Sequence, residues 1–118
     1  MTNKPPVEVV AAAALVSALK RLKKKYPHVT DDLETLIRQL QAGETPGDQI
    51  PRIGYTVFKV RLANTDAQRG KRGGYRAIYY LKTTSYILLL YMYSKSEQED
   101  MPPDEIRRLI EEETPPTD

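Results

Sequence analysis

The chain has 118 residues, no cysteine and a formal net charge of +2. This length suffices for one domain with its own core, and the lack of cysteine excludes disulfides and thiolate metal sites. No apolar stretch reaches the roughly 18 uncharged residues that a membrane span needs, so we expect a soluble, cytoplasmic protein without membrane contact. We predict a single domain over residues 1–118, with residues 1–6 and 114–118 flexible.

Two amphipathic helices are predicted in the first third of the chain. Residues 11–26 carry leucines spaced four and three apart, and cations in the last turn favour the negative end of the helix dipole. Residues 7–10 fit either a short edge strand or the start of this helix. Thr30 is the expected N-cap of the second helix and Gly43 its expected C-cap. Two such helices should pack as a hairpin against one side of a sheet.

After a turn-rich connection at residues 44–52, residues 55–95 predict three strands in an antiparallel meander. Runs rich in Val, Ile, Tyr and Leu are separated by breaks that are too short for parallel crossovers. In the first run, apolar side chains alternate with Lys59 and Arg61, which places both cations on the opposite face. The third run, residues 85–93, is apolar on both faces, which predicts a buried strand flanked by the strands that carry the cations.

The second strand follows Gly73 and Gly74 and carries Arg76. We interpret the glycine pair as permitting a bulge or a positive φ, because it matches no phosphate-loop or dinucleotide pattern. A last helix is expected from Pro102 or Pro103, where proline suits a helix start. The predicted fold class is α+β: an N-terminal helical hairpin packed on a small antiparallel β-sheet, with a short C-terminal helix.

Cations are concentrated on the predicted sheet. Residues 59–82 contain seven cations and one acid, Asp66, whereas the residues after 96 are acidic. The favoured site consists of four cations that could bind phosphate: Lys59, Arg61, Arg76 and Lys95. A solvated sheet face is an equally common origin of such a pattern. The balance shifts towards a site because three separate segments place cations on a face that does not need them for folding.

Further residues could contact a nucleic acid. Arg69, Lys71 and Arg72 could bind its backbone, although a basic hairpin loop is an ordinary feature. Tyr75 and Tyr93 are the tyrosines best placed to stack on a base, a contact worth about 1–3 kcal/mol, while most tyrosines should serve packing.

Two other features receive no catalytic role. The single histidine, His28, lies in a turn and is assigned no function. The acids Glu97, Glu99 and Asp100 could in principle hold Mg²⁺, but we interpret them as solubilising a loop and favouring the start of the last helix.

The segments FKVR, GKRGGYRAIYYL and YSKSEQED resemble toxins of bacterial type II toxin-antitoxin systems, specifically the RelE/HigB group of the RelE/ParE superfamily. The resemblance extends over nearly the whole chain, from LKRLKKKYP to PDEIRRLI. It implies a small α+β domain that acts as an mRNA interferase, a ribosome-dependent endoribonuclease that inhibits translation. The implied partners are a cognate antitoxin protein, the ribosome and messenger RNA, with operator DNA contacted through the antitoxin. No metal or cofactor is implied.

The resemblance also implies roles for the four cations. The reaction is attack of a ribose 2′-hydroxyl on its neighbouring phosphate, with Arg76 as the transition-state clamp and Lys59 and Arg61 orienting the phosphate. A lysine with a lowered pKa would take the proton. The chain departs from the family at Ser96, where many relatives carry Arg, His or Tyr. Either Lys95 or Tyr93 substitutes for the missing general acid, or activity is weak or lost.

Two other functions stay open at this point. A superfamily relative could act without catalysis, as a ParE-like inhibitor of DNA gyrase or as an inactive protein that binds an antitoxin or nucleic acid. The third possibility is a basic RNA-binding module, for which salt-dependent RNA affinity without cleavage would be the sign.

Overall fold

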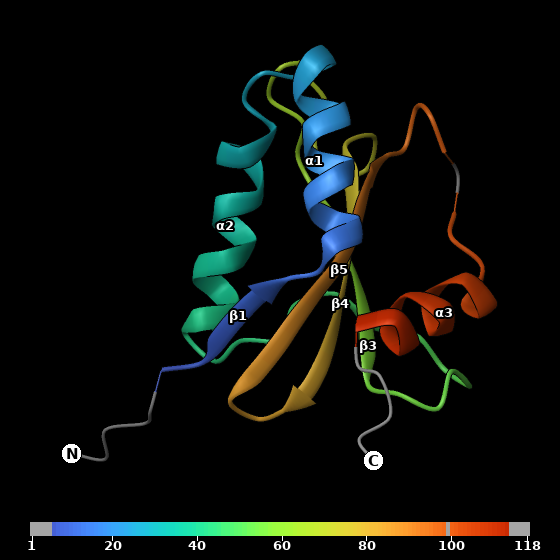
Figure 1. Cartoon of the computed structure of the whole chain (residues 1–118). Helices are drawn as coiled ribbons and strands as arrows, with labels where there is room; N and C mark the ends of the chain where they lie inside the picture. The colour runs from blue at the N-terminus through green and yellow to red at the C-terminus, as the bar shows by residue number, and fades with distance from the viewer. Residues whose placement is uncertain (1–5, 99, 114–118) are drawn as a thin grey trace.

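The computed structural model describes residues 6–98 and 100–113, and it has the predicted α+β fold with a C-terminal helix (Figure 1). The predicted flexible ends are residues 1–6 and 114–118, and all of these except residue 6 lie outside the described residues. The elements in chain order are β1 (Glu8–Ala11), α1 (Ala13–Lys25), α2 (Val29–Gln41), β2 (Asp48–Gln49), β3 (Val57–Leu62), β4 (Tyr75–Thr83), β5 (Tyr86–Ser94) and α3 (Pro103–Glu113).

The three predicted strands form the antiparallel meander, in which β4 pairs with both β3 and β5. Two short strands extend it to the order β1-β5-β4-β3-β2. Because β1 runs parallel to β5, the sheet is mixed. Of the two alternatives for residues 7–10, the edge strand is the one found, and it covers Glu8–Ala11. The predicted connection at residues 44–52 contains the edge strand β2. The expectation that β5 lies between the cation-bearing strands is wrong, since β4 with Arg76 is the central strand and β5 lies between β1 and β4.

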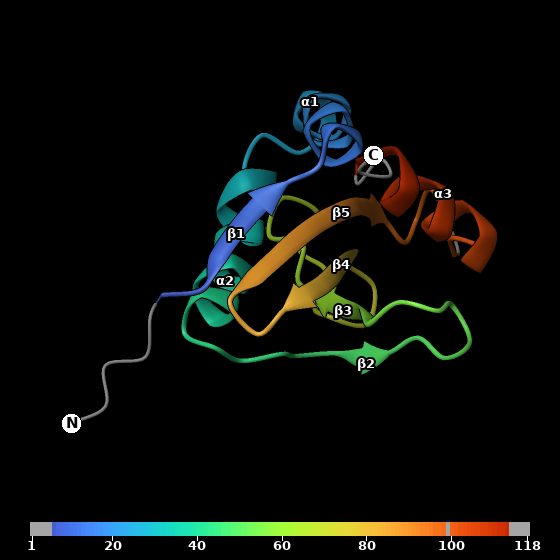
Figure 2. The same cartoon turned by 60° about the horizontal axis from the view of Figure 1, so that its bottom comes forward.

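Each face of the sheet has its own core (Figures 1 and 2). The helical hairpin α1–α2 covers one face, where leucines of both helices pack against Tyr75, Ala77 and Tyr79 of β4. The shorter α3 covers part of the other face and packs against β4 and β5, including Ile78 and Tyr93. Side chains of β4 therefore alternate between the two cores, as the pleat of a strand requires. The face opposite the hairpin is only partly covered, which leaves room for a site.

The helix ends differ slightly from the prediction. Thr30 is not the N-cap of α2, because the helix begins at Val29 and His28 occupies the cap position without a side-chain capping bond. Gly43 does end the helix, since it follows the C-cap residue Ala42 with a φ of 89° that glycine adopts without strain.

A β-bulge interrupts the pairing of β4 with β5. Ile78 pairs with Tyr91 and Tyr79 pairs with Leu89, so Leu90 has no partner across the ladder. An extra residue in one strand reverses the face that the following side chains occupy.

The bulge decides which side chains of β5 face away from the hairpin. Leu89 before the bulge and Met92 after it both lie in the hairpin core, a spacing of three that an unbroken strand would not give. Tyr93 consequently lies in the α3 core, and Lys95 follows on the same face. Strict alternation through residues 85–95 would have placed both on the hairpin side.

Gly74 allows two backbones to approach closely at the start of β4. A Cβ at this position would overlap the carbonyl oxygen of Leu62 and lie 2.9 Å from the amide nitrogen of Asn64. Neither Gly73 nor Gly74 has a positive φ, and no register shift occurs here, so the predicted bulge or positive φ is wrong. A Cβ on Gly73 would meet only the Arg69 side chain, at 3.5 Å.

We expect Gly74→Ala to destabilise the protein by roughly 1–3 kcal/mol, since overpacking against fixed backbone forces the loop away from β3. The free energy of unfolding from urea titration checks this, with Gly73→Ala as the matched control that should stay within about 1 kcal/mol of the parent protein. Equal stability of the two variants would contradict the close-packing explanation.

Candidate active site

The four predicted site cations converge on one groove. It lies on the sheet face opposite the hairpin and has a volume of about 410 Å³. Its walls come from β2, β3, β4 and the segment after β5, through six of the described residues: Asp48, Lys59, Arg61, Arg76, Lys95 and Asp100. The cations therefore share one concave surface, as expected for a phosphate site, while their individual roles stay predictions.

Arg76 is buried on the central strand yet lines the groove, with only 5% of its surface exposed. Its Nη1 donates hydrogen bonds to the carbonyl oxygens of Lys71 at 3.0 Å and Tyr75 at 3.2 Å, and its Nη2 donates to that of Arg72 at 2.9 Å. Burial and then the neighbouring Arg61 guanidinium lower the pKa of Arg76. An arginine nevertheless stays protonated in proteins, so Arg76 carries a buried positive charge.

The hydrogen bonds of Arg76 leave a defined part of its guanidinium for a ligand. Of the five N–H donors of an arginine, three are held by backbone carbonyls within the described part of the chain. The Nε–H and one Nη2–H make no hydrogen bond within the described part of the chain. Two free N–H donors of one guanidinium can bind two oxygens of a phosphate.

Lys59 is held by a carboxylate that the sequence analysis gave another role. Its Nζ lies 2.9 Å from Asp100 Oδ1 in an ion pair. The contact with Lys59 lowers the pKa of Asp100, against the opposing effect of burial. Asp100 comes from the segment before α3, more than 40 residues away in sequence, so nothing in the local pattern indicated the pair.

Asp48 is the second acid of the groove, and no sequence motif pointed to it. It lies on edge strand β2 directly across from Lys59, so both side chains lie on the same face of the sheet. Within residues 6–98 and 100–113, no cation lies close enough to Asp48 to form an ion pair. In the sequence, Asp48 is only an isolated acid in the segment between Gly47 and Pro51, which indicates no function. A carboxylate without a cation partner in a cationic groove is able to accept a proton.

Lys95 and Ser96 lie on different sides of the strand end. Lys95 is exposed and lines the groove, and its backbone N–H donates to the Gly74 carbonyl at 3.0 Å. The Ser96 hydroxyl lies 2.9 Å from that of Ser94, and contacts from Ser96 and then Ser94 lower the pKa of Tyr26 at the end of α1. Ser96 thus faces the hairpin and is not among the groove-lining residues.

The predicted stacking of Tyr75 and Tyr93 on a base is wrong for this arrangement. Tyr75 has no exposed surface and packs edge-on against Tyr26 in the hairpin core, with ring centroids 5.8 Å apart. Tyr93 is 2% exposed, and its hydroxyl has no hydrogen-bond partner among the described residues. Burial and the Asp100 charge raise the pKa of Tyr93 to about 12. Tyr93 borders Arg76 as a packing residue.

The basic loop lies next to the groove. Arg69, Lys71 and Arg72 are exposed, so contact with a nucleic-acid backbone stays a prediction for all three. The backbone of the loop has a second part in the site, because the carbonyls of Lys71 and Arg72 hold Arg76.

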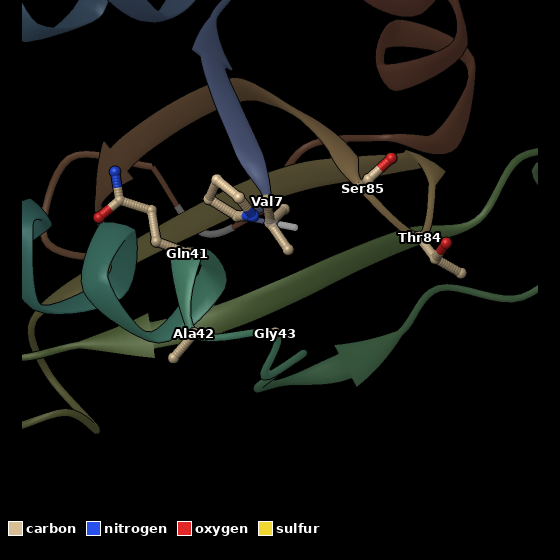
Figure 3. A pocket seen from close by; sticks show the side chains of 7 residues that line it. Val7, Gln41, Ala42, Gly43, Thr84 and Ser85 are labelled. Carbon is tan, nitrogen blue, oxygen red and sulfur yellow. The ribbon is translucent and has the colours of Figure 1, made fainter. Parts of the chain in front are cut away.

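A second hollow of about 450 Å³ lies between the start of β1, the end of α2 and the β4–β5 turn (Figure 3). Its lining includes Val7, Gln41 and Ser85, and none of the described residues that line it is charged, so they offer nothing that would hold a phosphate. The described residues contain no group of three or more His, Cys, Asp or Glu that could hold a metal, and Glu99 lies outside them. None of the described helices is long and apolar enough to cross a membrane.

Comparison with known proteins gives one family. A family model described as the RelE toxin of the RelE / RelB toxin-antitoxin system matches residues 15–113. The matched segment includes α1 from residue 15 onwards, the whole of α2, the strands β2 to β5 and α3. A comparison with curated proteins gives no match.

Replacing Lys59 with alanine should raise the pKa of Asp100 towards the ordinary aspartate value of about 3.9, because the main interaction that stabilises its charged form is removed. NMR titration of the Asp100 carboxyl carbon measures this shift. Lys82→Ala, which removes an exposed cation from the far end of β4, is the control and should leave that pKa unchanged. An unchanged value in Lys59→Ala would mean that the pair does not persist in solution.

Proposed function

The chain belongs to the RelE toxin family, and from this premise we propose that it is a ribosome-dependent endoribonuclease that cleaves messenger RNA and thereby inhibits translation. Membership implies an antitoxin as its protein partner. We further propose that it acts in the cytoplasm on ribosome-bound messenger RNA, and that it reaches operator DNA through the antitoxin. The observation that carries the proposal is the groove, where Lys59, Arg61 and Lys95 surround a buried Arg76 that keeps two N–H donors without a partner among the described residues.

The proposed reaction is an internal transfer at phosphorus. The ribose 2′-oxygen forms a bond to the adjacent phosphorus and loses its proton, the bond from phosphorus to the 5′-oxygen breaks, and that oxygen gains a proton. The products are a 2′,3′-cyclic phosphate and a 5′-hydroxyl. Negative charge on the phosphate oxygens increases in the transition state, so the pre-placed cations Arg76 and Arg61 stabilise it more than the ground state.

The two acids of the groove divide the remaining work. Asp100 orients Lys59 towards the groove through their 2.9 Å ion pair, so Lys59 binds a phosphate oxygen from a fixed position. Asp48, which has no cation partner within residues 6–98 and 100–113, accepts the proton of the 2′-hydroxyl. Carboxylates as a class are ionised near neutral pH, whereas a lysine must first lose a proton before it can serve as a base.

Lys95 is the proposed proton donor to the leaving 5′-oxygen. It is exposed at the edge of the groove and its ammonium group carries protons that it can transfer. Tyr93 is the less suitable donor because its ring is buried and its pKa is raised to about 12. This assignment replaces the general acid that relatives carry at the position of Ser96.

Arg61→Ala should reduce ribosome-dependent cleavage on the order of 10²- to 10³-fold without loss of stability, because Arg61 is exposed and supplies charge to the transition state. Cleavage of a messenger programmed into purified ribosomes is followed by primer extension. Arg38→Ala removes an equally exposed cation from α2 and should cleave at the parent rate.

The same assay separates the proposed function from its alternatives. Arg76→Lys keeps a charge but removes the planar guanidinium and its fixed N–H donors, so it should lose cleavage even where it folds normally by circular dichroism. Growth arrest by the parent protein with intact messages and induced DNA damage signalling would instead favour a gyrase inhibitor. Salt-dependent RNA binding without cleavage would favour an RNA-binding module.

Asp48→Asn should lower the cleavage rate by about 10²- to 10⁴-fold, because the amide cannot accept the 2′-hydroxyl proton. Asp104→Asn, which removes an exposed acid of α3, serves as the control. A parent-like cleavage rate in Asp48→Asn would assign the base to another group.

A further inference from the structure

The turn between α1 and α2 is fastened to the loop between β3 and β4. The His28 N–H donates to Asp66 Oδ2 at 2.7 Å, and His28 Nδ1 lies 2.7 Å from Asp66 Oδ1. Beside this contact, both the N–H and the hydroxyl of Thr65 donate to the Asp32 carboxylate at 3.0 Å. We call these four residues the clasp. It joins the hairpin on one side of the sheet to a loop that reaches the groove on the other.

Hydrogen bonds and close packing restrict the backbone of the loop between the clasp and Arg76. Asn64 and Arg69 exchange backbone hydrogen bonds of 2.8 and 2.9 Å across its neck, and the Asn64 side chain accepts from Ala67 N–H at 3.1 Å. Asn64 is 1% exposed, and Gly74 packs against it with no space for a side chain. Two and three residues after Arg69, the carbonyls of Lys71 and Arg72 hold the Arg76 guanidinium.

We propose that the clasp is a positioning device for Arg76: by fixing the β3–β4 loop to the hairpin, His28 and Asp66 fix the carbonyls that aim the Arg76 guanidinium into the groove. The proposal rests on the proposed nuclease function for its catalytic consequence, but its structural part does not. His28 and Asp66 are positioning residues because neither lines the groove.

The composition of the clasp explains an odd feature of the sequence. Asp66 is the single acid among the residues 59–82, which otherwise contain seven cations. An acid in a phosphate-binding segment weakens its attraction for RNA unless the charge is used elsewhere. Both oxygens of Asp66 are bonded to His28, which directs that charge to the hairpin and away from the groove.

The clasp has a defined pH dependence. Its hydrogen bond with Asp66 raises the pKa of His28, with smaller contributions from Asp31 and Asp32 of α2, which are the other charged groups that face it. The same contact lowers the pKa of Asp66. A histidine whose pKa is raised on folding stabilises the folded protein at pH values below its unfolded pKa of about 6.5. An aspartate whose pKa is lowered on folding stabilises the folded protein at pH values above its unfolded pKa of about 3.9. The charged clasp is therefore complete between about pH 4 and 6.5 and weakens as pH rises through the folded pKa of His28.

The first experiment tests the structural part without any nuclease assay. In Asp66→Asn, NMR should show faster hydrogen exchange at the amides of Asn64 and Arg69 and loss of the separate, slowly rotating Nη signals of Arg76. Asp31→Asn removes a neighbouring charge that makes no contact with the loop, and it should behave like the parent protein. Circular dichroism confirms that each variant is folded. Unchanged loop exchange and unchanged Arg76 signals in Asp66→Asn would overturn the proposal.

The second experiment measures cleavage on ribosomes across pH. Asp66→Asn should cleave about 10- to 100-fold more slowly than the parent, since small misplacement of a clamp costs rate steeply. His28→Asn keeps a donor nitrogen close to the position of Nδ1 but cannot titrate, so the rate ratio of parent to His28→Asn should fall as pH rises from about 6 to about 8. A role in stability alone would not produce that change in ratio.

The two experiments separate failure of the clasp proposal from failure of the nuclease proposal. A parent protein that does not cleave messages on ribosomes overturns the proposed function, and the NMR result alone then decides whether the clasp positions Arg76. A parent protein that cleaves, with Asp66→Asn cleaving equally fast at every pH, overturns the clasp proposal and leaves the nuclease assignment intact. Thr65→Val, which removes one hydroxyl contact to Asp32, should give a smaller loss in the same direction.

Discussion

The central constraint in this structure is a guanidinium buried on the middle strand of the sheet. A charge in such a place is costly unless its N–H groups are hydrogen-bonded. Arg76 meets this requirement with three backbone carbonyls, two of which belong to the β3–β4 loop. The loop must therefore pass close to β4. Three features keep the loop close to β4: the glycine at position 74, the backbone hydrogen bonds between Asn64 and Arg69, and the contacts to the hairpin.

The groove exists because the two faces of the sheet are covered unequally. Two helices of 13 residues each cover one face, whereas the 11-residue α3 covers only part of the other. The bulge at Leu90 then moves the end of β5 so that Tyr93 packs beside Arg76 and Lys95 reaches the open part of that face. Coverage by helices and the register of one strand pair together determine which cations meet.

Local patterns predicted the three helices, the three strands of the meander and the membership of the cation cluster, because strand alternation and helical periodicity are properties of neighbouring residues. They did not predict edge strand β2, which lies in the expected turn-rich connection. They placed Lys59 and Arg61 on the face away from the hairpin, as found. They did not predict the strand order, the bulge or the pairing of Lys59 with Asp100, since each depends on residues distant in sequence. The exposure of Tyr75 and Tyr93 was overestimated for the same reason. His28 looked isolated because its partner lies 38 positions along the chain.

The way each cation is held determines how much of its charge a ligand experiences. A carboxylate partner satisfies an ammonium group but also cancels its formal charge, as Asp100 does for Lys59 at 2.9 Å. Backbone carbonyls satisfy N–H donors through dipoles and leave the net charge in place. Arg76 is therefore both rigidly oriented and fully charged, although it is the most buried of the four cations. An arriving phosphate meets a charge that has already lost most of its water, so little reorganisation is needed at the moment of reaction.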